Sequence, residues 1–326
     1  MANSNNKVKK FGHPGKKARS ARYQGKGLQV DSSALQTIRE LLGKRLRRRD
    51  LLIEHLHLIQ DRFRCLSPSH LAALAEEMKL SLAEVYEVAT FYAHFDVMDN
   101  DSALIPPITI RVCDSLSCEL QGSTALYEKI ANGTDKKLIR VLRAPCMGRC
   151  ENAPIAEVGH RHIHQATAET VCNAANNGMT APIIPPYIEL EEYIKNGGYS
   201  TLKACINGSI GVDNVIETME KSALKGLGGA GFPAGKKWRF VKSEKGPRFL
   251  AVNADEGEPG TFKDRYYIER DPHRFIEGML IAAHVVSVEE CFIYLRDEYP
   301  GIHQVLTKEI EKITEKLETF EDVRRS

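Results

Sequence analysis

Two segments of the sequence decide the fold: ITIRVCDSLSC, residues 108–118, and KLIRVLRAPCMGRC, residues 137–150. Each contains a short run rich in β-branched and apolar residues, at 108–112 and 137–142, which is typical of a strand. Each strand is followed by a pair of cysteines. Residues 122–130 fit one helix, so the two segments predict a β-α-β unit.

The paired cysteines predict an iron–sulfur site. Four residues separate Cys113 from Cys118, and three separate Cys146 from Cys150. Soft thiolate ligands match iron that is bridged by sulfide, and four of them complete the two tetrahedral irons of a [2Fe-2S] cluster. A structural zinc site would favour two short knuckles, often with histidine, and neither pair here is a CxxC. Zinc and buried thiols are the alternatives.

The composition and the N-terminal segment indicate the class of protein and the cellular compartment. The chain is 42% hydrophobic and 27% charged, as expected of a globular protein. We see no apolar export signal at the start, so we expect a reducing, cytoplasmic setting in which cysteine clusters serve metals or catalysis rather than disulfides. No run approaches the roughly 18 apolar residues of a membrane helix, and we expect no membrane span.

The length of 326 residues predicts about two domains. Residues 1–30 form a basic arm that we expect to be disordered, with nucleic-acid binding as a weaker alternative to a solvated tail. Residues 31–172 combine a helical bundle with the β-α-β unit, because leucines and alanines recur there at three- and four-residue steps. Ser67 before Pro68, and Ser81 with Glu84, predict two helix starts, and the second helix should reach about residue 95. Residues 173–188 form a polar, proline-rich linker. Residues 189–326 alternate helices, one of them at 272–286, with strands, which predicts an α/β domain. The fold class is therefore α/β.

The segment after Cys150 adds strands to the sheet of the β-α-β unit. Residues 153–158 and 161–164 predict two strands around a turn at Gly159 and His160. With cysteines following both earlier strands, this order is a thioredoxin-like layout. His160, His162 and His164 alternate and would share one strand face. We expect an exposed hairpin face, with a metal patch as the alternative.

A glycine-rich loop, GLGGAGFPAGKKW, occupies residues 226–238. It contains the formal pattern G-x-G-x-x-G, but it follows a predicted helix rather than a strand, so an ordinary Rossmann site is rejected. Glycine amides beside Lys236 or Lys237 would suit a nucleotide phosphate. A flexible turn is the alternative.

An acidic loop, NADEGEPGTFKDR at residues 253–265, directly follows a predicted strand at 248–253. In open α/β sheets, ligands lie beyond the carboxyl ends of strands. Asp255, Glu256 and Glu258 repel one another, and ribose hydroxyls or a flavin ring would offer them hydrogen-bond donors. A solvated acidic turn is the alternative.

On these motifs the chain resembles the flavoprotein arm of respiratory complex I and its soluble relatives. Residues 31–175, with ATFY at 89–92 and the four cysteines, are similar to the 24 kDa subunit. Residues 189–326, with GGAGFP at 228–233 and NADEGEPG at 253–260, are similar to the start of the 51 kDa subunit.

The fusion of the two parts narrows the resemblance. With RRRDLL at 47–52 and Leu227, it is most similar to the β subunits of NAD-dependent formate dehydrogenases, and next to the diaphorase subunits of NAD-reducing hydrogenases. A complex I-like NADH dehydrogenase is a further alternative.

The resemblance implies an NAD-dependent oxidoreductase subunit that passes electrons between a [2Fe-2S] cluster, FMN and NAD(H). By analogy the cluster ligands are Cys113, Cys118, Cys146 and Cys150. The groups implied for FMN phosphate and nucleotide are Gly226, Gly228, Gly229, Gly231 and Lys237. Asn253, Asp255 and Glu256 would contact the flavin. Phe232 and Phe240 would stack on the dinucleotide, and Glu258 is the implied catalytic residue, bonded to ribose or nicotinamide.

The resemblance also implies partners and a departure. Electrons would come from a metal-pterin formate dehydrogenase subunit or from hydrogenase subunits. The sequence to Ser326 lacks the family's Gly-Glu-Glu motif, ubiquitin-like domain and CxxCxxC motif for a [4Fe-4S] cluster. We therefore expect an incomplete FMN/NAD(H)-binding domain that alone binds FMN weakly or not at all, with the remainder either on another chain or lost. A truncated, non-catalytic [2Fe-2S] electron-transfer module is the alternative.

Overall fold

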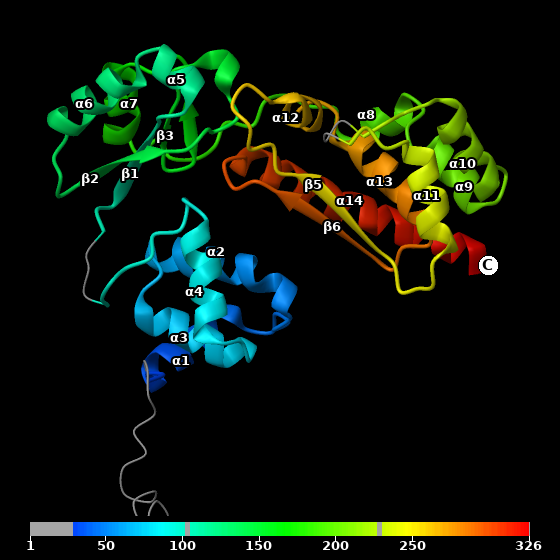
Figure 1. The fold of residues 1–326 in the computed structure, drawn as a ribbon, viewed down its shortest axis with the longest axis horizontal. Coiled ribbons are helices and arrows are strands. Elements are labelled where there is room, and N and C mark those ends of the chain that lie inside the picture. The colour runs from blue at the N-terminus through cyan, green and yellow to red at the C-terminus, as the bar shows by residue number, and fades with distance from the viewer. Residues whose placement is uncertain (1–28, 102–104, 227–229, 326) are drawn as a thin grey trace, which may run out of the picture. The chain divides into compact units, whose positions relative to one another are not determined.

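The computed structural model describes residues 29–101, 105–226 and 230–325, and side chains as far as residue 316 (Figure 1). It divides into two compact units, Met1–Ile105 and Pro106–Ser326, which are described one at a time. The predicted basic arm, except residues 29 and 30, lies outside the described residues. Among the described residues, no helix combines the length and the apolar character that crossing a membrane requires.

Helices make up the described part of the first unit. They are α1 (Ser32–Leu42), the 3-10 turn Arg49–Leu51, α2 (Leu52–Phe63), α3 (Pro68–Met78) and α4 (Leu82–Phe91). Their apolar faces meet in one core, whose fully buried members include Ile38, Leu56, Ile59, Leu71, Leu74 and Val85. The helical bundle predicted from three- and four-residue spacing is confirmed.

Capping side chains fix where α3 and α4 begin. The Ser67 hydroxyl accepts a hydrogen bond from the His70 amide, and Ser81 with Glu84 forms a reciprocal capping box. Both starts agree with the sequence prediction. The end of α4 does not, because the helix expected to reach residue 95 stops at Phe91. There Tyr92 takes an extended conformation and its ring meets Phe95 edge-on.

The second unit opens with a four-stranded sheet in the order β2-β1-β3-β4. Strands β1 (Ile108–Cys113) and β2 (Ile139–Ala144) are parallel, and β3 (Ala156–Val158) and β4 (Arg161–Ile163) are antiparallel additions. Helix α6 (Ser123–Gly133) makes the crossover between β1 and β2. The predicted β-α-β unit and the following hairpin are confirmed.

Two helices of this part are absent from the sequence prediction. Helix α5 (Leu116–Leu120) carries Cys118, and at five residues it is too short to show a hydrophobic period. Helix α7 (Ala168–Asn176) starts at a capping box of Thr167 and Thr170 and buries Val171 against the sheet. It extends four residues into the segment 173–188, which was expected to be a linker. The domain boundaries themselves stay predictions.

The rest of the unit holds the two-stranded parallel sheet of β5 (Phe249–Ala254) and β6 (Glu290–Leu295). In sequence order its helices are α8 (Leu190–Lys195), α9 (Ser200–Ile206), α10 (Val212–Lys221), α11 (Ala234–Ser243), α12 (Lys263–Ile268), α13 (Pro272–Val286) and α14 (Pro300–Arg325). Figure 1 shows α13 and α14 alongside the β5-β6 pair. The helix predicted over 272–286 matches α13 residue for residue.

Both strands of this sheet end at the same edge, and a loop follows each of them there. β5 and β6 run parallel in a register that pairs Ala254 with Leu295. The acidic loop leaves β5 at that edge, and Arg296 follows β6 there. The parallel sheet therefore places the acidic loop next to residues 296–299.

Candidate functional site

The four paired cysteines converge at the carboxyl ends of β1 and β2. Cys113 is the last residue of β1, and the register pairs it with Ala144 at the end of β2. The Cys146 and Cys150 sulfurs lie 3.4 Å apart. The Cys113 thiol is within hydrogen-bonding reach of both Cys118 and Cys146. The structure thus brings together all four residues named from their spacing.

Their surroundings are apolar. Met147 and Ile155 are almost fully buried and pack with Cys113 and Cys118 in one small cluster. The hydrogen bond with Cys118 is the main cause that raises the pKa of Cys113 to about 11, and the same bond lowers the pKa of Cys118. Four thiolates in such a place would repel one another unless a cation joined them. The donor set therefore fits a thiolate-bound metal group.

The spacing of the sulfurs bears on which group fits. A tetrahedral zinc with Zn–S bonds of about 2.3 Å would need all four sulfurs within about 4 Å of one another. In the described part of the chain, no three of these sulfurs lie mutually within 4.8 Å. A binuclear cluster instead takes its ligands in two pairs, one pair on each iron. The arrangement suits [2Fe-2S] better than one zinc ion.

The loop between Cys146 and Cys150, called the cysteine loop here, needs glycine at one position. Gly148 has φ of +63°, and a Cβ added there would overlap the phenol ring of Tyr299. Its amide also points to the Cys146 sulfur, at 3.4 Å. Glycine thus permits both the left-handed turn and the close approach of the Tyr299 ring.

The acidic loop uses one of its carboxylates internally. Glu256 is buried, and it accepts hydrogen bonds from the Asp264 and Arg265 amides at 2.8 and 3.2 Å at the start of α12. The Tyr299 hydroxyl donates to the same carboxylate at 3.3 Å. These partners give Glu256 a structural role that its position in the motif did not reveal.

Three other predicted residues of this loop remain open to solvent. Asn253, Asp255 and Glu258 are exposed. The Asn253 side chain accepts a hydrogen bond from the Asp255 amide at 3.0 Å, which shapes the turn after β5. Asp255 and Glu258 keep their carboxylates at the surface of the loop, where a ligand could reach them. Their contacts with flavin and nicotinamide stay predictions.

The acidic loop and the cysteine loop are bonded to each other. The Gly260 amide donates to the Cys150 sulfur at 3.1 Å. Arg265 donates from Nε to the Gly148 carbonyl at 2.9 Å, and Arg296 donates to the Cys146 carbonyl. Sequence reasoning named neither arginine, because no spacing links them to cysteines more than a hundred residues away.

Arg265 and Arg149 are both paired with carboxylates. Arg265 bonds Glu151 and Glu269, and Arg149 also bonds Glu269, at 2.6 Å. Burial alone would lower the pKa of Arg265, but the Glu269 and Glu151 carboxylates raise it above its ordinary value. The pairs keep these guanidinium groups charged beside the cysteine loop.

The glycine-rich loop is described only in part. Gly228, Gly229 and Leu227 lie outside the described residues. The amide of Gly226 donates to the Phe232 carbonyl at 3.1 Å, and Gly231 has φ of +59°. These contacts close the described ends of the loop into a turn.

Helix α11 begins inside the segment expected to be a loop, at Ala234, and it carries Lys237 exposed in its first turn. Gly235 is buried against α10, where a Cβ would lie 2.6 Å from the Glu220 amide nitrogen. That glycine therefore serves helix packing. Phe232 and Phe240 are exposed with ring centroids 6.2 Å apart, which suits the predicted stacking role.

The three alternating histidines are not one exposed face. His162 is buried, and its Nδ1 accepts a hydrogen bond from Arg149 Nε at 2.9 Å. Burial, and then the Arg149 charge, holds the pKa of His162 well below its ordinary value. The expectation of an exposed strand face is wrong for His162, because Arg149 packs onto this hairpin. His160 and His164 are exposed and line a cavity of about 240 Å³ with Arg149 and Glu269.

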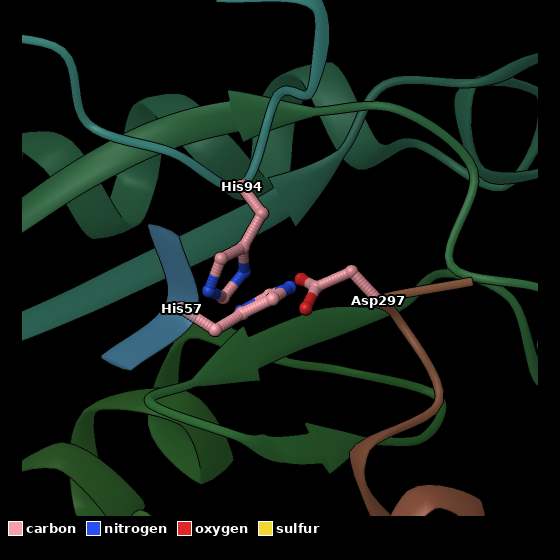
Figure 2. A group of neighbouring side chains, drawn as sticks. All are labelled: His57, His94 and Asp297. Atoms are coloured by element: carbon pink, nitrogen blue, oxygen red, sulfur yellow. The ribbon is translucent and has the colours of Figure 1, made fainter. Parts of the chain in front are cut away.

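Figure 2 shows three further side chains with ligand-type atoms, His57, His94 and Asp297. His57 and His94 belong to the first unit, where their ring centroids are 5.4 Å apart. His57 also packs against Phe95, at 4.8 Å. Asp297 belongs to the second unit. The two histidines are half-buried and contact each other and an aromatic ring, and we assign no metal site to them.

Comparison with known families covers most of the chain. Residues 38–177 match the family described as thioredoxin-like [2Fe-2S] ferredoxin, and residues 219–323 match the Nuo51 FMN-binding domain. A subunit of the NADH-quinone oxidoreductase of Aquifex aeolicus is 47% identical over 154 residues, which are 47% of this chain and 35% of that protein. The alpha subunit of the NAD-reducing hydrogenase HoxS of Cupriavidus necator is 28% identical over 301 residues, 82% of this chain and 49% of that protein.

Solved structures of NAD+-reducing [NiFe]-hydrogenase show the same fold. The air-oxidised form gives a TM-score of 0.67 at 24% identity, over 83% of this chain and 50% of that one. The H2-reduced form gives 0.67 at 26%, over 84% and 49%. The chain spans about half the length, or less, of these relatives. The predicted fold class is confirmed, and the chain combines a part like the 24 kDa subunit of complex I with a part like the 51 kDa subunit.

Proposed function

We propose that this chain is a diaphorase-type electron-transfer subunit of an NAD-dependent oxidoreductase. Electrons would pass between NAD(H), FMN and a [2Fe-2S] cluster on Cys113, Cys118, Cys146 and Cys150. The observation that carries the proposal is the bond between the two loops, from the Gly260 amide to the Cys150 sulfur. This bond supports the proposal, because it joins a ligand of the expected cluster to the loop expected to hold flavin and nucleotide.

FMN, when bound, accepts a hydride as an electron pair and releases electrons one at a time. The protein contributes binding and orientation. Phe232 and Phe240 offer adjacent exposed rings to a planar ligand, which is worth about 1 kcal/mol per stacked ring. Asp255 and Glu258 can accept hydrogen bonds from ribose or flavin donors. Met147 and Ile155 give Cys113 and Cys118 an apolar surrounding.

The electron donor is a finer part of the proposal. The RRRDLL segment at 47–52 favours an NAD-dependent formate dehydrogenase, whose metal-pterin subunit would be the partner. Leu227, the other residue used for this assignment, lies outside the described residues. The match to the HoxS alpha subunit over 82% of the chain favours hydrogenase partners instead. Isolating the assembled complex and asking whether formate or hydrogen reduces NAD+ separates the two.

The redox proposal itself is tested on the full chain, reconstituted anaerobically with iron, sulfide and FMN. We expect two irons and two sulfides per chain, and an EPR signal of a reduced [2Fe-2S] cluster after addition of NADH. Zinc in place of iron would contradict the cluster. A cluster that dithionite reduces, but NADH does not even with FMN bound, would leave a non-catalytic [2Fe-2S] module.

A further inference from the structure

Arg296 links the two loops of the proposed redox site. It follows β6 directly and is buried. One guanidinium nitrogen, Nη2, donates to the carbonyl of Cys146, and the other, Nη1, donates to the carbonyl of Glu256 at 2.6 Å. The same side chain therefore holds a cluster ligand and the acidic loop.

The charge of Arg296 is balanced by one carboxylate that lies nearer to solvent. Its Nε donates to Glu298 at 3.0 Å, and the Glu298 side chain is 27% exposed to solvent. The guanidinium lies over the Tyr299 ring, at 5.3 Å from its centroid. Within the described residues, Glu298 is the carboxylate that forms an ion pair with it. The cation is thus more deeply buried than its counter-charge.

Two other guanidinium groups lie at the cysteine loop, and they share two carboxylates. Arg265 binds the Gly148 carbonyl and is held by Glu151 and Glu269. Arg149 is held by Glu269. Arg296 is the one whose nitrogen bonds the carbonyl of a cluster ligand itself. Among these arginines, the charge of Arg296 should therefore act most directly on the cluster.

Reduction of a [2Fe-2S] cluster by one electron adds one unit of negative charge. A nearby cation stabilises the reduced form more than the oxidised form, and burial strengthens the effect because water screens less. We propose that Arg296 is a positioning residue that holds the cysteine loop and raises the reduction potential of the cluster. This inference rests on the proposed function, since it requires the cluster.

The test is an EPR-monitored potential titration of the reconstituted full chain, in which dithionite donates the electron. We expect Arg296→Gln to shift the midpoint to a more negative potential by about 59 mV, which is a tenfold change in the ratio of oxidised to reduced cluster. Arg296→Lys keeps the charge and should restore most of the potential. Glu298→Gln removes the counter-charge and should move the midpoint in the opposite direction.

The matched control is Arg274→Gln. Arg274 lies on α13, is 80% exposed and pairs with Asp271, so the same loss of charge there should leave the midpoint unchanged. Iron content is measured in every variant. Wild-type chain without two irons would refute the proposed function itself.

Unchanged midpoints in Arg296→Gln and Glu298→Gln, with two irons in each, would overturn the role of Arg296 while the cluster assignment stands. If Arg296→Gln loses the cluster, the midpoint potentials of Arg296→Lys and Glu298→Gln test the role of Arg296 instead. A more positive midpoint in Glu298→Gln would then support the role. An unchanged midpoint there would refute it.

Discussion

The phenol ring of Tyr299 fills the space that a side chain on Gly148 would need. Gly148 also has φ of +63°, so Gly148→Ala should suffer both backbone strain and a clash. We expect a loss of roughly 2–4 kcal/mol in unfolding free energy and reduced iron retention. Chemical denaturation followed by the fluorescence of Trp238, the single tryptophan, measures the first quantity.

Gly178→Ala separates the two effects. Gly178 has the same φ of +63°, but no atom lies within 4 Å of the position of its added Cβ. We expect it to cost about 1 kcal/mol, the strain alone. Equal costs for the two variants would mean that the Tyr299 ring moves away freely and does not hold the cysteine loop.

Cys150→Ser should disrupt the cluster, because a hydroxyl is a poorer ligand for iron than a thiolate. We expect less than two irons per chain or a changed EPR spectrum. Cys172→Ser is the matched control, since Cys172 lies on α7 and was not assigned to the cluster. An unchanged spectrum in Cys150→Ser, or the same loss in Cys172→Ser, would remove Cys150 from the ligand set.

The cysteine site could be predicted well from the sequence because the information is local. Two β-branched runs, each followed closely by a cysteine, are enough to place Cys113 and Cys146 near neighbouring strand ends once the strands pair in parallel. Long helices with apolar periodicity, such as α13, can likewise be predicted with accurate bounds. Short helices such as α5 lack a full period, and the sequence does not indicate them.

Long-range partners could not be predicted from the sequence. Glu256 is predicted to contact the flavin, which stays a prediction, but its hydrogen bonds from α12 and Tyr299 were not foreseen. His162 looks like part of an exposed alternation, yet Arg149 covers it. Arg296 belongs to no motif at all. In each case the deciding partner is a charged or polar group brought close only by folding.

Glu256→Gln distinguishes a structural from a ligand-binding role. The glutamine amide keeps one acceptor oxygen, but it loses the negative charge and the second oxygen, and the carboxylate uses both oxygens to accept backbone N–H bonds. We therefore expect a loss of about 1–3 kcal/mol in unfolding free energy without any ligand present. Asp255→Asn is the control in the same loop. Asp255 is exposed, and its substitution should leave stability unchanged and weaken FMN or NADH binding. Calorimetric titration with each ligand checks the second effect, and the reverse pattern would exchange the two roles.

His162 should make the second unit sensitive to acid. Its pKa is well below the ordinary 6.5 in the folded state, chiefly through burial, whereas an unfolded chain restores the ordinary value. The unfolded state therefore binds a proton that the folded state rejects, so the stabilisation is present above pH 6.5 and is lost as the pH falls. One such group contributes at most about 1.4 kcal/mol per pH unit.

His162→Gln should flatten this dependence between pH 7 and pH 5, measured as the unfolding free energy followed at Trp238. His303→Gln is the control, because His303 is exposed on α14. The glutamine can still accept the hydrogen bond from Arg149 but cannot take up the proton. A slope as steep in His162→Gln as in the wild type would assign the acid sensitivity to other groups of the second unit, such as His164, whose pKa burial also lowers.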